Sequence, residues 1–328
     1  MMLKYCKRTI VAAAFSSLLL LSFQSFGQES EATPKPRLEE DVRVVTIPIS
    51  IFTEKELDKK QAEEFVEAGE ITVEEDGEEQ QILSIRSVSN QPIALAVLIQ
   101  EDLTMNINNQ LKDLGEFIRR LPEGSRVMVA YLRSGTIQIR QKFTKDLEEA
   151  ADSLRIVAGS PAVAPRNPYD GVKEAIERFE GVPTGRRAIL LISDGLDLSN
   201  GVNSSSPTLS QALDTAILRA QRNGVAIYGF YASATYTSGG NSRLIGNAQS
   251  SLLRIARETG GKAFFQGSLT PVSFEPFFRD LDRALNRQFA LSYLSTHMKK
   301  GYHKVEVLSS NPVVKIEHPK GYYYRRRR

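Results

Sequence analysis

Two apolar stretches decide the fold of this chain: Ile93-Ala94-Leu95-Ala96-Val97-Leu98-Ile99 and Ala188-Ile189-Leu190-Leu191-Ile192-Ser193. Each has the length of one strand and lacks the alternation of apolar and polar residues that a half-exposed strand shows. A continuously apolar strand is buried on both faces, which is typical of a parallel sheet covered by helices on both sides. The two stretches therefore predict doubly buried strands of an α/β sheet.

Helical and strand-like patterns alternate around these stretches. Apolar residues recur at helical spacing in residues 108–121, 147–157, 170–179, 209–222, 252–258 and 271–287. Further strands are predicted at residues 126–132, 136–143, 225–231 and 263–265. This alternation predicts a doubly wound, Rossmann-like α/β domain over residues 91–288, in which segment 136–143 is an antiparallel edge strand.

The segments that flank this domain have the period-two pattern of β-strands. Residues 42–52 alternate although Pro48 interrupts them, and Asp76-Gly77 marks the turn of a hairpin. Alternating strands return after the domain, but they are too few for a stable sheet of their own. We therefore expect residues 41–90 and residues 289–328 to form one small β module that flanks the α/β domain or contains it as an insertion.

The first 27 residues have the pattern of a cleaved secretory signal peptide. Three basic residues precede an apolar run over residues 9–21, and Ser25-Phe26-Gly27 offers the small residues of a cleavage site. The alternative is a transmembrane anchor, for which the run is short, since a span needs about 20 residues. Residues 28–40 are polar and contain two prolines, as in disordered linkers. These patterns predict an exported protein, periplasmic or extracellular.

The scarcity of reactive side chains excludes several classes of enzyme. The three histidines, His297, His303 and His318, all lie near the end of the chain, and the single cysteine, Cys6, lies in the expected signal peptide. The middle of the chain therefore cannot hold a Ser-His-Asp triad or a His-rich zinc site. Neither of the two common Gly-rich phosphate-binding motifs is present.

The end of the chain is aromatic and basic, because Tyr322-Tyr323-Tyr324 precedes Arg325-Arg326-Arg327-Arg328. Such a tail is typical of a solvated strand end, or of a contact with anionic lipid or another polyanion. A nucleic-acid partner is not consistent with an export signal. Membrane contact is expected only through this tail.

Four pieces of the α/β segment follow the order found in von Willebrand factor type A domains. They are Ala96 to Met105, Asn167-Pro168-Tyr169-Asp170, Leu190 to Gly195 and Glu258 to Phe264. The chain resembles that family, and its flanks resemble the secreted von Willebrand type A-related proteins of Acidobacteria and similar bacteria. The resemblance covers nearly all of the expected mature chain, and it implies the doubly wound fold and a protein-binding role.

The resemblance also implies a metal-ion-dependent adhesion site at the carboxyl edge of the sheet. The family uses Asp-x-Ser-x-Ser after the first strand, a Thr from a middle loop and an Asp after the fourth strand. These positions fall here on Gln100, Asp102, Thr104, Arg166 and Asp194. Mg²⁺ prefers about six oxygen ligands, so the glutamine and above all the guanidinium make the site degenerate.

Two interpretations of this degenerate site remain open from the sequence. In the first, Mg²⁺ or Mn²⁺ binds through Asp102, Thr104 and Asp194, Arg166 turns aside, and the ion binds an acidic partner. In the second, Arg166 fills the site and pairs with Asp194 or Asp102, since an arginine–carboxylate pair is a good replacement for a lost ion. No cofactor is then required.

The leading hypothesis is an exported, non-catalytic protein-binding module of the adhesion or scaffold type. We expect its protein partner to contact Gln100, Asp102, Arg166, Asp194 and Tyr236. Tyr236 belongs to a polar, Gly-rich segment, residues 233–247, which is predicted to be a loop. An envelope hydrolase that uses Asp102 and Asp194 as an acid–base pair is the alternative from another class.

Overall fold

The computed structural model describes residues 42–53, 71–133, 136–183, 185–267, 273–312 and 314–324. Residues 41–328 form one compact unit. The predicted signal peptide, the predicted linker and the four terminal arginines lie outside the described residues. Within the described part of the chain, no helix combines the length and the apolar character needed to cross a membrane.

A six-stranded sheet forms the centre of the α/β domain, with the order β6-β5-β4-β7-β8-β9. All neighbours are parallel except the pair of β5 and β6. The strands are β4 (Ile93–Gln100), β5 (Arg126–Arg133), β6 (Thr136–Thr144), β7 (Arg186–Ser193), β8 (Val225–Tyr231) and β9 (Ala263–Phe264). The predicted doubly wound sheet and its antiparallel edge strand are therefore confirmed.

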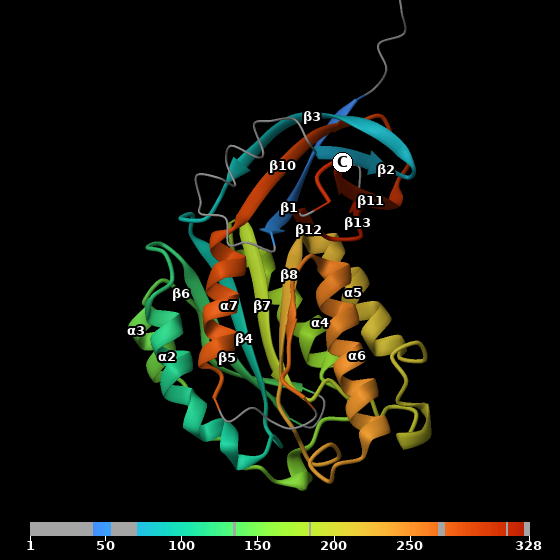
Figure 1. Cartoon of the computed structure of the whole chain (residues 1–328). Helices are drawn as coiled ribbons and strands as arrows, with labels where there is room; N and C mark the ends of the chain where they lie inside the picture. The colour runs from blue at the N-terminus through green and yellow to red at the C-terminus, as the bar shows by residue number, and fades with distance from the viewer. Residues whose placement is uncertain are drawn as a thin grey trace, which may run out of the picture. The chain divides into compact units, whose positions relative to one another are not determined.

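Helices cover both faces of this sheet (Figure 1). They are α2 (Leu111–Arg119), α3 (Leu147–Asp152), α4 (Tyr169–Glu177), α5 (Gln211–Asn223), α6 (Ser242–Thr259) and α7 (Glu275–Asn286). Leu95, Val97 and Ile99 of β4 pack in the cluster that contains α2, α3 and α7. The alternate residues Ala96 and Leu98 pack with α4, α5 and α6. This two-sided packing explains why β4 is apolar at every position but its last.

A second sheet of seven strands is built from both ends of the chain, with the order β12-β1-β10-β3-β2-β11-β13. The strands are β1 (Arg43–Thr53), β2 (Ile71–Glu75), β3 (Glu78–Ser87), β10 (Gln288–Ser295), β11 (Gly301–Ser309), β12 (Val314–Glu317) and β13 (Gly321–Tyr324). Their pairings interleave the N-terminal and C-terminal strands, as β1 and β3 both pair with β10. The expected β module is therefore confirmed as part of the fold class.

Two local signals in the β module have the structure that the sequence predicts. Asp76 and Gly77 have φ values of 53° and 88°, which are the positive values of the tight turn between β2 and β3. Pro48 pairs with Ala290 of β10, whereas β12 pairs with β1 only from Ser50 onward. At Pro48 the strand is therefore an edge, where proline is tolerated.

The predicted loop over residues 233–247 is wrong in its second half. Helix α6 begins at Ser242, because the Asn241 side chain accepts hydrogen bonds from the first backbone N–H groups of the helix. Leu244 and Ile245 are buried and start its apolar face. The sequence prediction began this helix at residue 252, since the polar residues of its first turns obscured the helical period.

Candidate functional site

The residues implied by the resemblance gather at the carboxyl edge of the six-stranded sheet. Gln100 ends β4, Asp194 follows β7, and the loop after β8 crosses beside them. A β-bridge joins Leu103 to Ala234, and the Thr104 N–H donates a 2.9 Å hydrogen bond to the Ser233 carbonyl. This edge of an open α/β sheet is where such folds bind ligands.

Gln100 is the centre of the polar network at this edge. Its amide nitrogen donates a 2.8 Å hydrogen bond to Asp102 Oδ1. Its amide oxygen accepts hydrogen bonds from the Ser193 hydroxyl at 2.6 Å and from the Asp194 N–H at 3.3 Å. A neutral amide therefore joins the loops after β4 and β7, with its donor toward one carboxylate and its acceptor toward the other strand.

Each oxygen of the two carboxylates already accepts a hydrogen bond. Asp102 Oδ2 accepts one from the Thr235 N–H at 3.2 Å. Asp194 Oδ1 accepts from the Leu196 N–H at 3.1 Å, and Asp194 Oδ2 from the Thr237 hydroxyl at 3.3 Å. Asp102 and Asp194 are each only 3% exposed. The site is thus closed by the chain's own donors.

Thr235 and Thr237 are site residues that the sequence did not predict. They lie in the loop after β8, far from Asp102 and Asp194 along the chain, and belong to no motif. Thr237 is fully buried, and its hydroxyl also accepts a 2.9 Å hydrogen bond from the Ala234 N–H. A threonine in a polar, Gly-rich loop gives no sequence signal of such burial.

Burial makes Asp194 an unusual carboxyl group. Loss of hydration, and then the nearby Asp102 carboxylate, raise the pKa of Asp194 to about 7. The hydrogen bonds from Leu196, Gln100 and Thr237 oppose this rise without cancelling it. The ionised form of Asp194 is therefore costly in the folded protein near neutral pH.

The expected pairing of Arg166 with Asp102 or Asp194 is wrong. Arg166 is exposed, and no ion pair joins it to either carboxylate in the part of the chain that the structure describes. Its loop is held by the backbone instead, since the Arg166 carbonyl accepts a 2.7 Å hydrogen bond from the Leu198 N–H. The hydrogen bonds that Arg166 was expected to donate to the two carboxylates come instead from the Gln100 amide, the Thr235 N–H and the Thr237 hydroxyl.

The residues at the positions of a von Willebrand type A metal site do not fit a divalent ion here. Mg²⁺ needs about six oxygen ligands in an octahedral arrangement. All four carboxylate oxygens of Asp102 and Asp194 are occupied by N–H or O–H donors, and one donor is the Gln100 amide, which repels a cation. The Thr104 side chain is half-buried at the start of a 3-10 helix and does not cap it.

Exposed apolar side chains surround this closed site. Met105, Ile156 and Tyr236 are 64%, 67% and 47% exposed. Met105 begins the 3-10 helix in the connection after β4, and the other two lie in the loops after α3 and after β8. The connection after β4 touches the loop after α3, because a Cβ atom at Gly159 would lie 3.2 Å from Met105 Cγ. We call Met105, Ile156 and Tyr236 the apical triad.

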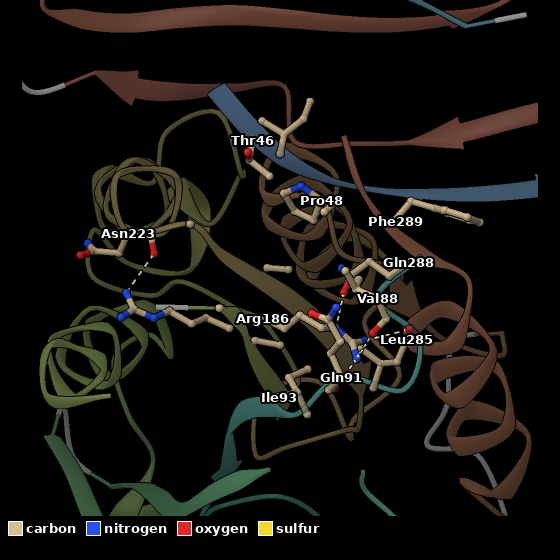
Figure 2. A pocket seen from close by; sticks show the side chains of 17 residues that line it. Thr46, Pro48, Val88, Gln91, Ile93, Arg186, Asn223, Leu285, Gln288 and Phe289 are labelled. Carbon is tan, nitrogen blue, oxygen red and sulfur yellow. Dashed lines mark hydrogen bonds between the residues drawn. The ribbon is translucent and has the colours of Figure 1, made fainter. Parts of the chain in front are cut away.

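A cavity of about 420 Å³ lies at the opposite, amino-terminal edge of the sheet, where β4 and β7 approach the β module. Figure 2 shows the Arg186 side chain extending along it. Its guanidinium donates to the carbonyls of Val88, Gln91 and Leu285 and to the Gln288 side chain, at 2.8–3.0 Å. Arg186 therefore holds the segment that leads from β3 into β4 and the segment that leads from α7 into β10.

Strand order, the antiparallel β6 and the position of the site together define a von Willebrand type A-like fold. No family model and no curated protein matches the sequence. Similar solved structures include an aerotolerance-related membrane protein from Bacteroides fragilis, at 13% identity and a TM-score of 0.39 over 60% of this chain and 98% of that one. A von Willebrand factor type A protein from Catenulispora acidiphila has 10% identity and a TM-score of 0.41 over 74% and 72% of the two chains.

Proposed function

We propose that this protein is an exported, non-catalytic protein-binding module whose carboxyl edge binds its partner without a metal ion. The observation that carries the proposal is the closed network around Gln100. Asp102 and Asp194 are buried and hydrogen-bonded, so they present neither free ligands to an ion nor an accessible acid–base pair to a substrate. The proposed export, and the kinship with secreted Acidobacteria-type proteins, depend on the leader-like residues 1–27 and on the motifs of the flanks.

The apical triad supports the proposed binding surface. Exposed large side chains on adjoining loops, placed around a desolvated polar centre, are typical of protein-binding patches, where aromatic, Met and Arg side chains are enriched. Arg166, which is exposed beside this edge, adds a cation. The surface therefore suits a partner with an apolar patch and some negative charge.

We expect that Mg²⁺ does not bind at the carboxyl edge and therefore leaves the melting temperature of the protein unchanged. An ion that binds the folded state at about 100 times its dissociation constant adds about 2.7 kcal/mol, which is several degrees in melting temperature for a domain of this size. We expect no such shift when thermal melts in EDTA and in excess Mg²⁺ are compared. A Mg²⁺-induced or Mn²⁺-induced shift that disappears in Asp194→Ala would instead establish the metal-dependent alternative.

A photo-crosslinking side chain at position 156 is expected to capture the partner in cells of the source organism. The same group at Leu308, which is 47% exposed on β11 of the β module, is the matched control. We expect an adduct of defined mass from position 156 and not from position 308, with equal yield in EDTA and in Mg²⁺. Equal adducts from both positions, or none from position 156, would contradict the proposed surface.

A further inference from the structure

A second polar cluster lies in the β module, at the tight turn between β2 and β3. Glu75, Asp76 and His297 each bring one potential ligand atom to this point, and these atoms lie within 4.8 Å of one another. Glu75 ends β2, Asp76 is in the turn, and His297 lies two residues beyond the end of β10. The fold of the β module brings these residues together, and no sequence motif joins them.

Two atoms of this cluster have unmet bonding capacity. Glu75 is fully buried, yet its Oε2 has no donor in hydrogen-bonding geometry among the described residues. His297 Nδ1 is likewise buried without a hydrogen-bond partner in this part of the chain, 4.0 Å from Glu75 Oε1. A buried carboxylate oxygen or imidazole nitrogen without a partner is costly, so two of them in one cluster call for an explanation such as a bound ion.

The other atoms of the cluster are held firmly in place. Glu75 Oε1 accepts hydrogen bonds from the Tyr322 hydroxyl at 2.6 Å and from Arg43 at 3.2 Å. His303 Nδ1 lies 2.8 Å from Asp76 Oδ2, and its Nε2 lies 2.7 Å from the Lys299 carbonyl. Asp76 Oδ1 also accepts a 2.8 Å hydrogen bond from the Lys304 N–H, and His303 Nδ1 lies 3.2 Å from Glu75 Oε1. Unlike Asp102 and Asp194, the pair Glu75 and Asp76 therefore keeps one carboxylate oxygen, Glu75 Oε2, without a donor among the described residues. An ion here would share Asp76 with these donors.

His297 has the surroundings of a metal-binding histidine. Its Nε2 lies 3.5 Å from Glu78 Oε2, so a ring N–H can face a carboxylate while Nδ1 faces Glu75. A histidine that binds a metal usually donates its other N–H to such a carboxylate, which fixes the ring and raises its basicity. The side chains of His297 and Asp76 are 21% and 36% exposed, which gives an ion access from solvent.

We propose that Glu75, Asp76 and His297 form a binding site for a divalent transition-metal ion, with Zn²⁺ as the best match. One imidazole and two carboxylates are a ligand set that Zn²⁺ accepts at about 2.0–2.2 Å, with a fourth position for water. The imidazole disfavours Mg²⁺, which prefers all-oxygen sites. The carboxylates of Glu75 and Asp76 would face the ion, and Glu78 would lie behind His297, so three negative charges stand near the site against the positive charge of Arg43. The ion would fasten the β2–β3 turn to the end of β10.

The test is Zn²⁺ binding to the tag-free purified protein, followed by calorimetry and by thermal melts after treatment with a chelator. We expect one Zn²⁺ per chain, a rise in melting temperature, and a visible absorption band of tetrahedral type when Co²⁺ replaces Zn²⁺. His297→Ala removes a ligand from a partly exposed position, so it should fold and should lose more affinity than the roughly 10–100-fold typical of an outer hydrogen-bond partner. Glu78→Gln should lose about 10–100-fold.

Glu79→Gln is the matched control, because Glu79 is an exposed neighbour with the same charge that lies outside the cluster. It should bind Zn²⁺ like the wild type. The proposal is overturned if the wild type binds no Zn²⁺ in the micromolar range, or if His297→Ala and Glu79→Gln bind it equally well.

Discussion

Arg186→Met is expected to lower the free energy of unfolding by about 2–4 kcal/mol, because it leaves several buried acceptors without a donor. The guanidinium joins Val88 and Gln91, which lead into the α/β domain, to Leu285 and Gln288, which lead out of it. Burial lowers the pKa of Arg186, but the group meets carbonyls on every side. Methionine fills a similar volume and supplies none of these hydrogen bonds. Denaturant unfolding at neutral pH measures the loss.

Arg187→Met is the matched control for this variant. Arg187 stands next to Arg186 in β7, but among the described residues its guanidinium donates to two carbonyls, those of Val182 at 2.7 Å and Asn223 at 3.5 Å. Its loss should cost less than half as much. Equal destabilisation by the two variants would show that Arg186 has no special role between the sheets.

Asp194→Asn is expected to stabilise the protein above neutral pH. A folded-state pKa of about 7, against a value of 3.8 for an unperturbed aspartate, means that the folded state binds the extra proton between these two pH values. Wild-type stability should therefore fall as pH rises from about 4 to 7, and stay reduced above that. Asparagine carries no charge, so the variant should gain on the order of 2 kcal/mol at pH 8 and little at pH 4.

The hydrogen bonds around position 194 can be kept in this variant. The Asn oxygen can accept from the Leu196 N–H, and its amide can donate to the Thr237 hydroxyl, which can turn its own proton to the Ala234 carbonyl 3.4 Å away. Stability curves against pH measure the effect. If the variant is less stable than the wild type at pH 8, the ionised form of Asp194 does not destabilise the folded protein, and the prediction is wrong.

Asp170→Asn supplies a control with the opposite sign. Partial burial alone would raise the pKa of Asp170, but hydrogen bonds from Lys173 and Asn167 outweigh it and lower the pKa. The ionised form is therefore favoured in the folded protein, and this contribution is lost as pH falls through the folded-state pKa. Asp170→Asn should be neutral or destabilising at pH 8, where Asp194→Asn stabilises.

The sequence predicts the fold well because a strand that is buried on both faces is apolar at nearly every position, and this composition can be recognised without the structure. β4 and β7 are buried at nearly every position, and this pattern has few alternatives to a sheet covered on both faces. The Asp76-Gly77 turn is predicted for a similar reason, since few residues tolerate two successive positive φ values. In each case the information is local.

The site is predicted less well because its bonding depends on loops that meet only in three dimensions. Motif positions place Gln100, Asp102 and Asp194 together at one edge. They do not reveal that the loop after β8 brings Thr235 and Thr237 onto both carboxylates, nor that the exposed Arg166 side chain stays outside the network. The cluster of Glu75, Asp76 and His297 belongs to no sequence motif, since His297 lies far along the chain from the other two residues.

The α/β domain enters and leaves the β module through two strands that are neighbours. Ser87 at the end of β3 pairs with Phe289 near the start of β10, and the Val88 N–H donates a 3.0 Å hydrogen bond to the Gln288 carbonyl. The two ends of the domain therefore lie side by side on adjacent, hydrogen-bonded strands. A tight turn in place of residues 88–288 would convert β3 and β10 into a simple hairpin, so the strand order of the β module does not require the α/β domain between them.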